Sequence, residues 1–155
     1  MATFQVSTTT ATLAASTAYS AIELRPVSST PIQVLKWWID GNSYTSSDHP
    51  LLVQAGKFSA AVTTNTSATP LPVDYRGQDS TANTAAGVNA TSEGAGTWVA
   101  NGELHSLAPQ GLPYACWETE DTALWVPGGS YWRLRITPGS ALTSTTVTCG
   151  VLWKE

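Results

Sequence analysis

Charge is scarce in this sequence, and its scarcity excludes some functions. Charged residues make up 12% of the 155 residues, about half of the roughly one quarter that is usual in soluble domains. The net charge is -4, and the seven Lys and Arg residues are scattered. The neutralisation of phosphates that drives nucleic-acid binding therefore has no basis here, and we expect no nucleic-acid partner.

Long apolar runs are also missing. No stretch approaches the roughly 20 apolar residues that a membrane-spanning helix needs. The N-terminal sequence MATFQVSTTT lacks the basic start and apolar core of a signal peptide. We therefore expect a protein that has no membrane partner and is made in a cytoplasm.

Cysteine and histidine are rare, with two residues of each. His49 and His105 have no second ligand at the short spacing of metal sites, so we expect no metal. Cys116 and Cys149 fall in candidate strands and are expected to be small buried hydrophobes, although a disulfide between neighbouring strands stays open. No nucleophile elbow, phosphate-binding loop or dinucleotide motif occurs, so we expect neither a cofactor nor enzymatic activity.

One acidic cluster, formed by Glu118, Glu120 and Asp121, keeps an enzyme in view. A glycosidase needs two carboxylates on opposite sides of a sugar cleft. Within one strand, Glu118 and Glu120 point the same way about 7 Å apart. We expect a solvated edge, since an active site would require a second carboxylate from a distant strand.

Helical periodicity is absent as well, because Thr, Ser, Gly and Pro interrupt every candidate helix. Short alternating runs bounded by turn residues take its place. They predict an all-β fold, a single-domain jelly-roll-like antiparallel β-sandwich over 1–155. The expected strands cover 3–7, 19–25, 32–39, 51–55, 58–63, 71–75, 97–100, 112–119, 123–126, 131–137 and 145–153.

The last 25 residues carry the clearest strand pattern. Two alternating runs flank a Pro-Gly dipeptide, which predicts an antiparallel hairpin that closes the domain. Within each run one face is apolar, and these faces hold Trp132, Leu134 and Ile136, then Val147, Cys149, Val151 and Trp153. The alternation predicts that Trp132 is buried.

The run PIQVLKWWIDGN places large apolar residues on both faces of one strand. The two sets are Leu35, Trp37 and Ile39, and Ile32, Val34 and Trp38. Such a strand is central, or it meets a partner subunit on its second face. Asp40-Gly41 favours positive φ and predicts a tight reversal at the end of the strand.

Between residues 59 and 96 the composition shifts to Thr, Ala, Asn, Ser and Gly. Few core candidates remain in this stretch, so it is expected to be a loop or an extended arm. A loop would be mobile, whereas an arm would become ordered against a neighbouring subunit.

Tryptophan is abundant, with seven residues. Exposed rings on one sandwich face would stack on sugars, as in a carbohydrate-binding module or a receptor-binding head. Alternatively, the rings fill the core and a subunit interface, where large aromatic area dominates the energetics. Alternation with apolar neighbours favours burial of Trp132 and Trp153.

Five stretches taken in order resemble a family of small structural proteins of tailed bacteriophages that decorate or cement the capsid. These are TATLAASTAYSAIEL, PIQVLKWWIDGN, the His of GELHSLAPQG, VPGGSYWRLRIT and the closing strand that ends in Trp-Lys-Glu. The resemblance implies a jelly-roll or related sandwich that assembles as a homotrimer on the capsid surface. It implies the major capsid protein as partner, a virion location and no enzymatic activity.

A receptor-binding or carbohydrate-binding module of a phage fibre or tail is the alternative. Candidate contact residues lie in the polar, turn-rich stretches and at Trp98 just beyond them. They are Asp40, Asn42, Tyr44, Asp48, Asn65, Tyr75, Arg76 and Trp98.

Overall fold

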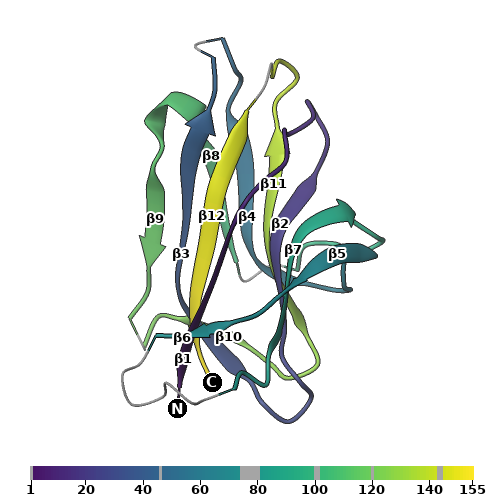
Figure 1. Cartoon of the computed structure of the whole chain (residues 1–155), viewed down its shortest axis with the longest axis vertical. Helices are drawn as coiled ribbons and strands as arrows, with labels where there is room; N and C mark the ends of the chain where they lie inside the picture. Colours follow the sequence, from purple (N-terminus) through teal and green to yellow (C-terminus); the bar gives the residue numbers. More distant parts are fainter. Residues whose placement is uncertain (1, 46, 74–80, 100–101, 120, 143–144) are drawn as a thin grey trace.

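Two antiparallel sheets face each other across one hydrophobic core in the computed structural model (Figure 1). The structure describes residues 2–45, 47–73, 81–99, 102–119, 121–142 and 145–155. The first sheet contains β1 (Thr3–Thr9), β3 (Ile32–Ser43), β6 (Leu71–Pro72), β9 (Tyr114–Trp117), β10 (Leu124–Val126) and β12 (Thr146–Lys154). The second contains β2 (Tyr19–Arg25), β4 (Leu51–Phe58), β5 (Thr64–Ala68), β7 (Ala85–Ser92), β8 (Glu103–Leu107) and β11 (Tyr131–Pro138). The prediction of an all-β sandwich is confirmed.

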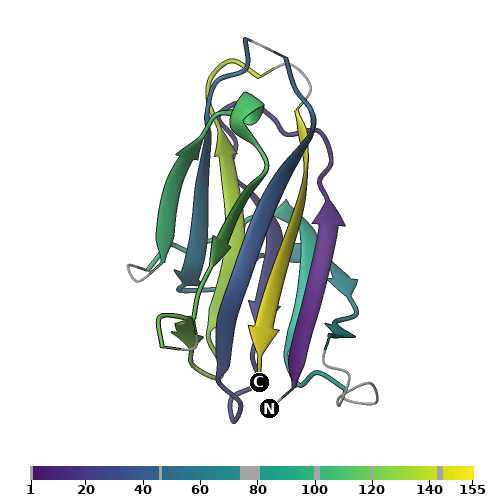
Figure 2. The same cartoon turned by 90° about the vertical axis from the view of Figure 1, so that its left-hand side faces the viewer.

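Eight of the strands follow a jelly-roll order. In the first sheet β1, β12, β3 and β9 are neighbours, and in the second β2, β11, β4 and β8 are neighbours. Along the chain, each strand of this set lies in the opposite sheet to the one before it, except that β4 and β8 lie in the same sheet. Figure 2 shows β3 in blue, β12 in yellow and β1 in purple side by side on the first sheet. Within the described residues the only helical turn is η1 (Pro109–Gly111).

The predicted C-terminal hairpin is wrong, because β11 and β12 belong to opposite sheets. β11 pairs with β2 and β4, whereas β12 pairs with β1 and β3. Both strands do bury the face that the alternation indicates, and Trp132 and Trp153 are at most 1% exposed. An apolar face is buried equally well by facing a second sheet as by lying in one sheet, so alternation identifies the face but not the hydrogen-bonding partner.

A bulge in β3 explains why apolar residues alternate onto both of its faces. Trp153 pairs with Val34 and Leu152 pairs with Lys36, so Leu35 is an extra residue. The bulge reverses the alternation. Residues on either side of it consequently face the same core, namely Ile32, Val34, Trp37 and Ile39.

The expected reversal at Asp40-Gly41 is also wrong. β3 continues to Ser43, with Gly41 paired to Val147 and Ser43 paired to Thr146. Asp40 and Gly41 pair in regular register, and a second register shift makes Asn42, the next residue, an extra residue in the strand. The turn residues therefore mark a bulge rather than the end of the element.

The expectation of a loop or arm over 59–96 is wrong for the parts of it that form strands β5 and β7, whereas β6 lies within the strand expected at 71–75. β7 lies between β5 and β2 and buries Ala86, Val88 and Ala90. The expected strands at 58–63 and 97–100 are not formed as such, since Phe58 ends β4 and Trp98 makes one isolated bridge to it. Because Ala, Gly and Asn have low strand propensity, the sequence of β7 does not predict a strand.

A buried ion pair joins the neighbouring strands β2 and β11 of the second sheet. Arg133 is 0% exposed and Glu23 is 1% exposed, and the guanidinium Nε lies 3.3 Å from Oε1 of Glu23. Glu23 also accepts a hydrogen bond from the backbone N–H of Val62 at 2.7 Å. Burial of the guanidinium lowers the pKa of Arg133, and the carboxylates of Glu23 and Glu93 oppose that effect.

Candidate functional site

Polar side chains occupy core-facing positions where the two sheets come together at one edge. Strand β8 is an edge of the second sheet, and β9 is an edge of the first. Glu103 on β8 pairs with the buried Ala55, and Cys116 on β9 pairs with the buried Trp37. Because paired residues in a sheet point to the same face, Glu103 and Cys116 both point between the sheets.

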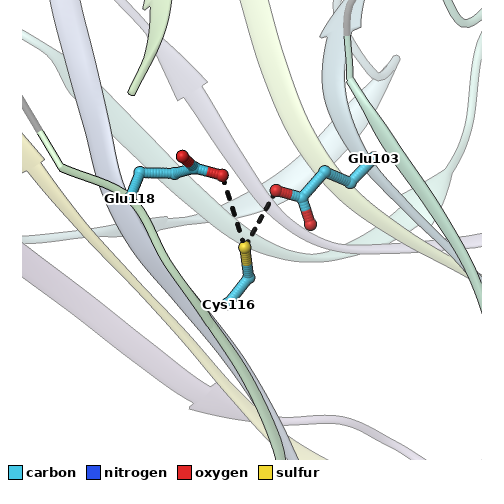
Figure 3. Close-up of side chains that lie close together, drawn as sticks. All are labelled: Glu103, Cys116 and Glu118. Atoms are coloured by element: carbon cyan, nitrogen blue, oxygen red, sulfur yellow. Dashed lines mark hydrogen bonds between the residues drawn. The ribbon is translucent and has the colours of Figure 1, made fainter. Parts of the chain in front are cut away.

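A thiol and two carboxylates meet at this edge, as Figure 3 shows. The Sγ of Cys116 donates to Oε1 of Glu103 at 2.8 Å and lies 3.6 Å from Oε1 of Glu118. Glu118 follows β9 directly, and its backbone N–H donates to the carbonyl of Leu35 on β3 at 2.8 Å. All three side chains are half-buried.

His105 and Tyr114 extend this cluster. The imidazole Nε2 lies 2.9 Å from Oε2 of Glu103, and the Tyr114 hydroxyl lies 3.3 Å from the same nitrogen. The rings of Trp37, His105 and Tyr114 pack together, with centroids 4.9 to 5.7 Å apart. The aromatic rings therefore hold the imidazole beside the carboxylate of Glu103.

The pKa values of three members of the cluster are shifted, and for Tyr114 burial raises the pKa. Burial raises the pKa of the Cys116 thiol, and the neighbouring carboxylates of Glu103 and Glu118 raise it further. For Glu103, burial opposes ionisation, but the hydrogen bonds with Cys116, His105 and Glu118 outweigh burial and lower its pKa. A protonated thiol beside an ionised carboxylate is the state that these shifts favour.

A cavity of about 190 Å³ adjoins Glu103 and Glu118. It extends inward between the sheets to Trp37 and Trp132, and Thr122 also lines it. The cavity therefore leaves room for a small ligand next to the carboxylates of Glu103 and Glu118.

These residues overlap only in part with the expected ones. Glu118 is half-buried against Glu103, which corrects the expectation of a solvated acidic edge at this position; Asp121 is exposed and Glu120 lies outside the described residues. Cys149 is 0% exposed, as expected, and burial raises its pKa, whereas Cys116 is half-buried among polar groups. Both cysteines are free thiols. Glu103 was not among the expected site residues, although ELHSL alternates and places two polar side chains, Glu103 and His105, on one face.

A second feature, here called the aromatic strip, lies on the outer face of the first sheet. It consists of Lys36, Trp38, Trp117 and Trp125. Trp117 is 68% exposed and Trp125 is 51% exposed. The Lys36 ammonium lies 3.7 Å from the ring centroid of Trp117 and 5.1 Å from that of Trp38.

Strand pairing explains why these four residues share a face. Trp117 pairs with Lys36, and Trp125 pairs with Gln33 on the same edge of β3. Val34 and Trp37 point inward, so Gln33, Lys36 and Trp38 point outward across the bulge. The tryptophans thus divide between roles: Trp37, Trp132 and Trp153 are buried, whereas Trp117 and Trp125 are exposed.

The expected contact residues of the 40–48 loop do not share one environment. Asp48 is 6% exposed, and its carboxylate accepts hydrogen bonds from the N–H of Thr45 at 2.8 Å and from the hydroxyl of Thr145 at 2.7 Å. Asp48 therefore stabilises the loop from within, which corrects its placement on a contact surface. The other three residues are exposed: Asp40 and Asn42 lie on β3, and Tyr44 follows it.

The remaining expected residues lie elsewhere. Asn65 is half-buried, and its side-chain amide donates to Glu23 at 3.1 Å, so it supports the buried ion pair. Trp98 is half-buried against Gly56 and Gly102. Tyr75 and Arg76 lie outside the described residues.

The fold and these two features define a jelly-roll β-sandwich with a polar cluster at one inter-sheet edge and an aromatic strip on one outer face. No helix in the described ranges is long and apolar enough to cross a membrane. Comparison with known proteins matched no family model, no curated protein and no solved structure.

Proposed function

We propose that the protein is a structural protein of a tailed bacteriophage virion, a capsid decoration or cement protein. In this role it is a homotrimer on the outer capsid surface, where it contacts the major capsid protein and stabilises the shell without enzymatic activity. The sequence resemblance motivates the proposal, and the aromatic strip is the observation that carries it.

Exposed tryptophan is costly on a domain that functions alone. Fully burying a large aromatic side chain removes roughly 150–250 Å² from water, and aromatic residues are enriched where protein surfaces meet. Trp117 and Trp125 stand on a paired strand edge, so the backbone already holds them in place. A rigid aromatic surface loses little conformational entropy on association, which supports a subunit interface.

Low charge supports the same proposal. Only 12% of the residues are charged, so subunits meet with little repulsion and little desolvation of ions. Lys36, the one cation of the strip, already lies over the Trp117 ring. Its ammonium can remain at the rim of an interface while its stem covers apolar surface.

The mechanism that follows is mechanical. A trimer presents three equivalent capsid-binding surfaces, so weak contacts gain effective concentration without any new contact. Area buried across the junctions between capsid subunits then raises the barrier to their separation.

Light scattering over a dilution series tests the assembly step. We expect a mass about three times the 16.3 kDa of the chain, and a monomer in the double variant Trp117→Ser with Trp125→Ser. Leu71→Ser is the matched control, because Leu71 is 64% exposed on β6, outside the strip. A wild-type chain that stays monomeric at all concentrations would contradict the proposal.

Co-sedimentation with capsids assembled from the major capsid protein alone tests the cement step. We expect saturable binding and a higher temperature of capsid disruption. A trimer that neither binds such capsids nor protects them would contradict the cement role.

Sugar binding is the second candidate, favoured by the exposure of the Trp117 and Trp125 rings on one sheet face. In that role the rings would stack on a polysaccharide. A glycan array together with tryptophan fluorescence separates the two candidates: a sugar-dependent shift that is lost in Trp125→Ser would support this second function.

A further inference from the structure

The polar cluster unites donor atoms of different chemical kinds from both sheets. Glu103 comes from β8 of the second sheet, whereas Cys116 and Glu118 come from β9 and the residue after it in the first. One sulfur and two carboxylate oxygens, one from each residue, lie within 4.8 Å of one another. Figure 3 shows the three side chains converging on one point from opposite sides.

We infer that Glu103, Cys116 and Glu118 bind a divalent transition-metal ion, with zinc the best match. Zinc accepts sulfur and oxygen ligands together, whereas calcium and magnesium select all-oxygen sites. Three protein ligands leave a fourth tetrahedral position open. The cavity beside Glu103 and Glu118 provides room for a water or a partner's side chain at that position.

The neighbours of the cluster are placed as supports for a metal ligand. His105 Nε2 lies 2.9 Å from Oε2 of Glu103, while Oε1 of the same carboxylate faces the sulfur. Tyr114 in turn contacts the imidazole. A ligating carboxylate held from behind by a hydrogen bond is the usual arrangement around metal sites.

Metal binding here is an exchange of a proton for a cation. The S–H bond of Cys116 breaks, its proton leaves to solvent, and the sulfur electron pair forms the bond to the ion. No oxidant or reductant takes part. The doubly positive ion then offsets two of the three negative charges of the thiolate and the two carboxylates, which otherwise repel one another.

The consequence is a link between the two sheets at their shared edge. Strand β8 pairs only with β4, and β9 pairs only with β3, within the described residues. An ion held by residues of both edges would join them directly. Zinc should therefore stabilise the folded sandwich, because an ion that binds the native state shifts the unfolding equilibrium towards it.

The test uses tag-free, metal-stripped full-length protein and cobalt(II) chloride as a spectroscopic probe. We expect one cobalt ion per chain, a thiolate-to-cobalt charge-transfer band and displacement by zinc chloride. Cys116→Ser should abolish the band, while Glu118→Gln should weaken zinc affinity by at least ~10-fold and His105→Gln by about 10- to 100-fold. Zinc should raise the melting temperature of the wild type by more than it raises that of Glu118→Gln.

Asp40→Asn is the matched control, since Asp40 is an exposed carboxylate elsewhere on β3, and it should bind zinc as the wild type does. Circular dichroism confirms that each variant is folded, and Glu118→Gln keeps the test decisive if Cys116→Ser does not fold. Folded wild type without a charge-transfer band overturns the inference. Zinc affinity equal in wild type, Cys116→Ser and Glu118→Gln overturns it as well.

Discussion

Trp38 lies directly across Gly150 of the adjacent strand on the outer face of the first sheet. The two residues are paired between β3 and β12. A Cβ placed on Gly150 would be 1.8 Å from Cζ2 of the Trp38 ring. The missing side chain of residue 150 is therefore what allows the indole to lie flat on the sheet and form one end of the aromatic strip.

Gly150→Ala should displace Trp38 and destabilise the fold. Overpacking of this kind costs about 1–3 kcal/mol, measurable by urea unfolding at equilibrium. Gly111→Ala is the control, because a Cβ at Gly111 has no neighbour within 4 Å. Equal unfolding free energies for the two variants would show that the Trp38 ring is free to move away.

Trp132→Ala should be among the most destabilising substitutions. The ring is 1% exposed between the sheets, and truncating a buried Trp costs about 3–5 kcal/mol. Trp125→Ala serves as the comparison, since Trp125 is 51% exposed, and its cost should be under ~1 kcal/mol. The prediction fails if both variants lose the same stability in chemical denaturation.

Glu23→Gln should destabilise the second sheet from within. The substitution leaves the fully buried Arg133 guanidinium without its nearest carboxylate, and breaking a buried ion pair costs about 3–5 kcal/mol. Thermal and urea unfolding measure the loss. Asp40→Asn, which removes an exposed carboxylate, should change stability by less than ~0.5 kcal/mol; a similar small effect for Glu23→Gln would refute the structural role of the pair.

The two thiols should differ from an exposed cysteine in reactivity. Because burial raises the pKa of Cys149 and the side chain is 0% exposed, the Cys116→Ser variant should resist a disulfide reagent until it unfolds. Cys116 in a Cys149→Ala variant should react slowly, since burial and adjacent carboxylates disfavour its thiolate. Rapid labelling of native Cys116→Ser would contradict the burial of Cys149.

A deletion in the Thr- and Ala-rich segment 59–96 should destabilise the fold if it removes strand β7. Removal of β7 takes away one of the two hydrogen-bonding partners of β2, the partner of β5 and the buried Val88. We therefore expect such a deletion to abolish cooperative unfolding, whereas deletion of an exposed loop would spare the fold. A deletion variant with a native melting curve would show that β7 is dispensable.

The inter-sheet site was the least predictable part of the molecule. Glu118 drew notice in the sequence as part of an acidic cluster, but Glu103 is distant from it along the chain. The two carboxylates meet because β8 and β9 end as facing edges of different sheets. Local sequence carries no information on which edges will face each other.

The sequence by itself determined that the chain forms strands and which face of most strands is buried, because side chains alternate with a period of two. It therefore predicted the sandwich, the burial of Trp132 and the burial of Cys149. Only the tertiary structure decided that β11 and β12 lie in opposite sheets, that a bulge at Leu35 turns apolar residues to one side, and that Cys116 lies between Glu103 and Glu118. The reason is that strand pairing depends on non-local hydrogen bonds and on the packing of one sheet against the other, neither of which is encoded by any single run of residues.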